Sequence, residues 1–123
     1  GYPAPIWDPA SGKINRTTAD HWRENFDLHH HLRTNWETLS AKLDGKLHIA
    51  VGDIDSYYLD NAVYLLDEYL DTEARPKIDY RVEYGRRKPH CWTGYSPSGS
   101  GEDITNVEFV QVVGRHFADN GVR

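Results

Sequence analysis

The sequence predicts an α/β protein, and three stretches of the chain support that prediction. Residues 46–51 are short, partly β-branched and preceded by a glycine, as is typical of a buried strand. Residues 58–70 carry apolar side chains at helical spacing. Residues 78–84 alternate apolar and polar side chains, the period of a strand with one wetter face. Strand, helix and strand in this order predict a right-handed crossover with two parallel strands in one sheet.

The part of the chain before this unit predicts an arm and helices. Three prolines and a glycine disfavour a helix over residues 1–16, so we expect an extended arm there that packs through its aromatic side chains. Thr17 or Thr18 then offers an N-cap for a short helix. Four leucines and a tryptophan, spaced by three or four residues, give residues 28–43 one apolar helix face that ends at Gly45.

The last third of the chain predicts a long loop followed by a helix. Residues 85–101 contain four glycines, two prolines and four Ser or Thr residues. Loops of this length are usually functional or disordered. Residues 103–119 repeat apolar side chains at helical spacing. Two parallel strands and three main helices are therefore expected within a single α/β unit over residues 1–123.

Composition and charge narrow the classes of partner. The 14 Lys and Arg and the 19 Asp and Glu give a net charge of −5, so nucleic acid is not an expected partner. No stretch approaches the roughly 18–20 apolar residues of a membrane-spanning helix, and the first residues lack a signal-peptide pattern, so we expect a soluble chain without a membrane partner. The single cysteine, Cys91, neither requires nor forbids an oxidising compartment.

Only two strands are evident in the sequence pattern. Most sheets have about four to six strands, and a two-stranded sheet leaves its outer edges unpaired. We therefore expect the sheet to be completed by an N-terminal part of a larger protein or by a partner chain. The absence of methionine favours a chain that begins within a longer one.

A carboxylate after the first strand and a histidine after the second form the candidate catalytic pair. Asp55 lies four residues beyond Val51, and His90 lies six beyond Tyr84. Because the carboxyl ends of parallel strands meet at one edge of a sheet, both side chains are expected at that edge. A carboxylate on one imidazole nitrogen orients the ring and leaves the other nitrogen to act as a base. The alternative is that Asp53 and Asp55 cap the next helix and that His90 is an ordinary loop histidine.

The turn and the loop that carry these residues contain short motifs. Gly52-Asp53-Ile54-Asp55 follows the first strand, and Lys88-Pro89-His90-Cys91-Trp92-Thr93-Gly94 follows the second. Over roughly residues 20–119 the chain resembles the C-terminal part of bacterial esterase-like proteins of the α/β-hydrolase fold. The resemblance implies hydrolysis of a small-molecule carboxylic ester or a related acyl transfer. It also implies that Asp55 is the triad acid and His90 the triad base, with Asp53 as the reserve acid.

One part of the family's machinery is missing from this sequence. α/β-Hydrolases carry the nucleophilic serine in a Gly-x-Ser-x-Gly elbow ahead of the acid and the histidine. No such elbow occurs here, and Gly94-Tyr95-Ser96-Pro97-Ser98 departs from it at the last position and lies after the histidine. We therefore expect a C-terminal fragment of a larger hydrolase that is inactive alone. The alternative is a non-catalytic α/β binding or dimerisation module in which two copies pair their exposed sheet edges.

Other side chains allow further interpretations. Two residues next to or near His90 are candidates for a pocket wall: Cys91 and Trp92. Cys91 is expected to be an inert small hydrophobic residue rather than a nucleophile. Adjacent residues of a helix point about 100° apart, so the run His29–His31 cannot bind one ion. We expect no metal and no other cofactor. The basic run Arg86–Lys88 is expected to face solvent.

Overall fold

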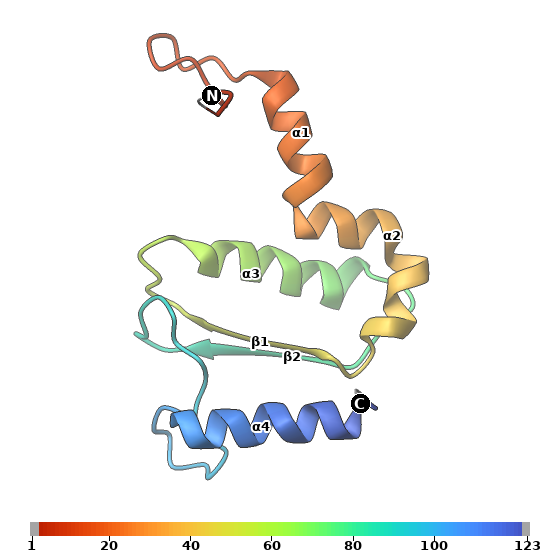
Figure 1. Cartoon of the computed structure of the whole chain (residues 1–123), viewed down its shortest axis with the longest axis vertical. Coiled ribbons are helices and arrows are strands. Elements are labelled where there is room, and N and C mark those ends of the chain that lie inside the picture. Colours follow the sequence, from red (N-terminus) through yellow and green to blue (C-terminus); the bar gives the residue numbers. More distant parts are fainter. Residues whose placement is uncertain (1–2, 122–123) are drawn as a thin grey trace. The chain divides into compact units, whose positions relative to one another are not determined.

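The computed structural model describes residues 3–121, and the chain divides into two compact units. Residues up to Trp36 belong to the first unit and residues from Glu37 onward to the second. Figure 1 shows the elements in chain order: α1 (Arg16–Phe26), α2 (Leu28–Leu43), β1 (Leu47–Gly52), α3 (Leu59–Glu68), the π-helical turn η1 (Tyr69–Glu73), β2 (Tyr80–Gly85) and α4 (Asn106–Asp119). Helix α2 crosses from one unit to the other and is kinked at Asn35, where φ is −117° and ψ is 18°.

The first unit contains a turn followed by α1. Trp7 and Ile14 form an isolated antiparallel bridge that closes the turn. The first two residues of the predicted arm lie outside the described residues. The predicted N-cap at Thr17 or Thr18 is wrong, because the side chain of Asn15 accepts a hydrogen bond from the amide of Thr18 and starts the helix earlier.

The second unit contains the predicted parallel sheet. Strands β1 and β2 pair in parallel, with Leu47 opposite Tyr80 at one end and Gly52 opposite Gly85 at the other. In Figure 1, α3 and α4 lie on opposite sides of this sheet. The prediction of an α/β protein with two parallel strands is therefore confirmed for the described part of the chain.

Helix α3 packs on the sheet face that carries the tyrosines of β2. Asp67 accepts hydrogen bonds from the hydroxyls of Tyr80 at 2.9 Å and Tyr84 at 2.8 Å. The ring of Tyr64 stacks on that of Tyr84, with 4.7 Å between the ring centroids. Leu70, in the turn after α3, is buried. These contacts join α3 and η1 to the sheet and form the core of the second unit.

Helix α4 lies on the other side of the sheet. Its start is fixed by a capping box, in which the side chains of Thr105 and Glu108 each accept a hydrogen bond from the other's backbone amide. The predicted start at residue 103 is therefore three residues early. A cavity of about 510 Å³ lies between polar strand residues such as Arg81 and Glu83 and apolar residues of α4 such as Val113.

Two observations bear on the partners predicted from the sequence. Within residues 3–121 the sheet has two strands, so each strand has one unpaired edge. No helix in this part of the chain is long and apolar enough to cross a bilayer.

Candidate active site

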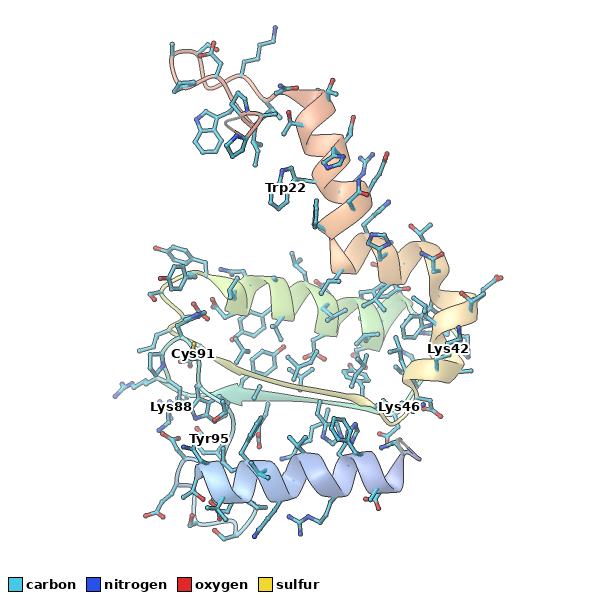
Figure 2. The ribbon with its side chains drawn as sticks, viewed as in Figure 1. Trp22, Lys42, Lys46, Lys88, Cys91 and Tyr95 are labelled. Atoms are coloured by element: carbon cyan, nitrogen blue, oxygen red, sulfur yellow. The ribbon has the colours of Figure 1, made fainter. Side chains whose placement is uncertain are left out.

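Two glycines at the carboxyl ends of the strands let the following loops approach the sheet closely. Gly52 pairs with Gly85 in the register of the two strands. A Cβ atom on Gly52 would lie 2.1 Å from the carbonyl oxygen of Lys88, and one on Gly85 would lie 2.7 Å from the indole of Trp92. Since neither position has room for a side chain, the loop after β2 packs directly on the strand ends. Figure 2 shows Lys88 and Cys91 at this end of the sheet and Lys46 at the opposite end.

The acid and the histidine singled out from the sequence are in direct contact. Nδ1 of His90 lies 2.9 Å from Oδ2 of Asp55. The side chain of Asp55 is only 4% exposed, whereas that of His90 is 36% exposed. The other carboxylate oxygen of Asp55 accepts a hydrogen bond from the amide of Tyr57 at 2.7 Å. This arrangement favours the tautomer with its proton on Nδ1 and leaves Nε2 of His90 as a potential base.

These hydrogen bonds also control the charge of the acid. The hydrogen bond with His90 is the main reason that the pKa of Asp55 lies below its ordinary value of 3.8. Burial opposes this effect, and the amides of Tyr57 and Leu59 reinforce it. Asp55 is therefore ionised at neutral pH, and its negative charge can stabilise a protonated imidazole.

Asp53, the reserve acid, has a different set of contacts. Its Oδ1 accepts a hydrogen bond from the amide of Arg87 at 2.5 Å. Its own amide donates to the carbonyl of Gly85 at 3.0 Å. Asp53 thus ties the turn after β1 to the turn after β2, and the geometry favours Asp55 as the partner of His90.

The two loops that carry the acid and the histidine contain unusual backbone conformations. Three non-glycine residues have positive φ within residues 3–121: Tyr58 at 59°, Arg87 at 56° and Cys91 at 63°. Tyr58 follows Asp55 by three residues, and the other two lie on either side of His90. L-residues rarely adopt this conformation, and such strained positions cluster where side chains must be held for function.

Tyr57 contacts both members of the pair and was not singled out by the sequence analysis. Its amide binds Asp55, and its ring centroid lies 4.6 Å from that of His90, with 59° between the ring planes. Its own side chain is otherwise largely exposed. The available sequence signal was its position two residues after the acid, in the same turn.

The predicted pocket-wall residues lie in different environments. Trp92 is buried; its indole N–H donates to Asp103 at 2.9 Å and its ring meets Tyr95 edge-on at 4.7 Å. Trp92 lines the cavity between the sheet and α4, a cavity whose lining does not include Asp55 or His90. Cys91 is exposed.

Neither a nucleophile nor a metal cluster is evident in the described part of the chain. The hydroxyl of Ser96 is buried and donates to Glu108 at 2.7 Å, so it is already engaged away from His90. Between residues 3 and 121, no hydroxyl or thiol forms a hydrogen bond with His90. The same residues contain no group of three or more His, Cys, Asp or Glu side chains that could hold a metal ion.

Comparison with known proteins does not identify a family. No protein-family model, curated protein or solved structure matches the chain.

Proposed function

We propose that Asp55 and His90 are the acid and the general base of a site that hydrolyses carboxylic esters. The observation that carries this proposal is the 2.9 Å contact between a buried carboxylate and an imidazole with a partly open face. In acyl transfer, the imidazole takes the proton of the nucleophilic hydroxyl and returns it to the leaving group. The carboxylate orients the ring and stabilises its protonated form. The resemblance to esterase-like α/β-hydrolases supports the same roles.

The nucleophile in this proposal lies outside the described residues. The sequence has no Gly-x-Ser-x-Gly elbow, and His90 has no hydroxyl or thiol partner within residues 3–121. The two unpaired strand edges offer a place for further strands to join the sheet. We therefore propose that this chain supplies the acid and histidine portion of a larger hydrolase and does not hydrolyse esters by itself.

The unpaired strand edges also favour a second candidate, a non-catalytic dimerisation module. Two copies that paired these edges would extend the sheet without any nucleophile. In that case the contact between Asp55 and His90 would only hold two loops together. A stable dimer in solution, measured by sedimentation, together with a lack of histidine-dependent activity, would favour this candidate.

Ester hydrolysis measured with p-nitrophenyl acetate tests the first candidate. We expect the isolated chain to show no turnover above that of His90→Gln. In the protein produced from the reading frame that encodes this chain, we expect His90→Gln to lower turnover by about four orders of magnitude or more. His21→Gln, an exposed histidine on α1, is the matched control and should leave turnover unchanged. Turnover that does not depend on His90 would contradict the proposal.

A further inference from the structure

A second carboxylate joins the two residues that flank His90. Asp103 lies just before α4 and forms an antiparallel bridge with Tyr95. One of its carboxylate oxygens, Oδ1, lies 2.8 Å from Nζ of Lys88 and accepts a hydrogen bond from the indole N–H of Trp92 at 2.9 Å. Lys88 lies two residues before His90, and Trp92 lies two residues after it. A single carboxylate therefore closes the five-residue segment that has the histidine at its centre.

The two ends of this segment are also fixed, one to the turn after β1 and the other over the end of β2. The carbonyl of Lys88 accepts a hydrogen bond from the amide of Ile54 at 3.2 Å. The indole of Trp92 lies over Gly85, where a Cβ atom would come within 2.7 Å of the ring. His90 lies in the middle of this segment, and its imidazole forms the hydrogen bond with Asp55. A short segment with both ends fixed has few accessible conformations, so the anchors decide where its central side chain points.

From this geometry we propose that Asp103 is a positioning residue for His90. By holding Lys88 and Trp92 on one carboxylate, it keeps the imidazole against Asp55. The proposal rests on the proposed function of the Asp55–His90 pair, and it does not require Asp103 to touch a substrate.

The electrostatics of Asp103 agree with this role. The hydrogen bond from Lys88, and after it the one from Trp92, hold the pKa of Asp103 below its ordinary value of 3.8. The same contact raises the pKa of Lys88. Both groups are therefore charged at neutral pH and their hydrogen bond is charge-assisted, although water screens part of the attraction because the Asp103 side chain is 52% exposed.

Nuclear magnetic resonance of the full chain tests the proposal. Asp103→Leu removes the hydrogen bonds with Lys88 and Trp92 while keeping a side chain of similar size. Asp103→Asn keeps an oxygen that can accept from the indole but removes the negative charge that pairs with Lys88. We expect Asp103→Leu to broaden or abolish the signal of the proton on Nδ1 of His90. We also expect the titration midpoint of the Asp55 carboxyl to rise toward 3.8, with a smaller rise in Asp103→Asn. Glu102→Gln changes the adjacent exposed carboxylate and should leave both signals unchanged.

A purely structural role for Asp103 predicts a different result. In that case Asp103→Leu would lower the melting temperature but leave the His90 signal and the titration midpoint of Asp55 in the folded protein as in the wild type. That outcome would overturn the proposal. If Asp103→Leu does not fold, Lys88→Met and Trp92→Phe each remove one of the two bonds and decide the question. Unchanged signals in both variants would likewise overturn it.

This measurement separates the role of Asp103 from the proposed function. The resonance signals do not depend on hydrolysis, so they can show positioning of His90 even if no ester is cleaved. Conversely, if the signals are unchanged in a folded Asp103→Leu variant while turnover still depends on His90, only the role of Asp103 is overturned. The proposed function of the Asp55–His90 pair then stands.

Discussion

The buried carboxylate of Asp55 makes the stability of the fold depend on pH. Its pKa is lower in the folded protein than its ordinary value of 3.8, mainly because of the hydrogen bond with His90. The folded state therefore holds this proton less tightly than the unfolded state does. The resulting stabilisation is fully present above the unfolded pKa, and it is lost as the pH falls from that value through the folded pKa.

Asp55→Asn removes this pH-dependent contribution. We expect the variant to be less stable than the wild type at pH 7, and we expect the difference to shrink as the pH falls below about 4. Urea unfolding at a series of pH values measures both. A difference in stability that stays constant down to pH 3 would show that the carboxylate is not held as the structure shows.

The sequence predicted the contact between Asp55 and His90 because its cause is general: groups that follow parallel strands meet at one edge of the sheet. It named Asp55 as the acid and kept Asp53 in reserve, because which carboxylate meets the imidazole depends on how each side chain leaves the turn. The contacts of Tyr57 and Asp103 with the pair or its loop were missed. Both depend on loop conformations that are set by packing rather than by any periodic pattern.

The glycines that end the two strands control how closely the His90 loop approaches the sheet. A Cβ atom on Gly52 would meet backbone atoms of Lys88 and Pro89, which cannot move aside by rotation of a side chain. We expect Gly52→Ala to destabilise the fold by roughly 1–3 kcal/mol, as overpacked sites do, and to displace the loop.

Urea unfolding measures this effect, and Gly114 in α4 provides the matched control. A Cβ atom at Gly114 has no neighbour within 4 Å. Gly114→Ala is therefore expected to stabilise the chain by up to about 1 kcal/mol, through the higher helix propensity of alanine. A Gly52→Ala variant as stable as the wild type would contradict the close packing of the loop on β1.

The contact between α3 and β2 predicts a delayed ionisation of two tyrosines. Burial, and then the hydrogen bond with Asp67, raise the pKa of Tyr80 to about 12 and raise that of Tyr84 as well. These contributions to stability are present below the ordinary pKa of 10.0 and are lost as the pH rises above it. We expect Tyr80 and Tyr84 to ionise late in an ultraviolet titration of the folded protein, and earlier in Asp67→Asn. The same titration curve in the wild type and in Asp67→Asn would contradict this contact.

The order of the elements followed from periodicity, but their ends did not. Alternation over the second strand and helical spacing before it identified strand, helix and strand correctly. The ends depend on single hydrogen bonds. The side chain of Asn15 begins α1, the pair Thr105 and Glu108 begins α4, and a π-helical turn extends the chain beyond α3 to Glu73.

The second unit has one sheet between two helices, with tyrosines on the sheet face toward α3 and charged residues on the face toward α4. The parallel pair was predictable because a crossover helix between two strands leaves few alternatives. That further strands complete the sheet and bring a nucleophile to Nε2 of His90 stays a prediction. These strands and this nucleophile would come from residues other than 3–121 or from a partner chain, so the pattern of this sequence does not predict them.

Our proposal for the site is that Asp55, rather than Asp53, orients His90 for catalysis. Its most direct test compares Asp55→Asn with Asp53→Asn in the protein produced from the reading frame that encodes this chain, with the turnover number on a p-nitrophenyl ester as the measurement. We expect Asp55→Asn to lower the turnover number by about four orders of magnitude, since the amide favours the wrong imidazole tautomer. Asp53→Asn, which loses only a bond to a backbone amide, should change it by less than about tenfold. Equal losses in the two variants, or no loss in Asp55→Asn, would contradict the claim.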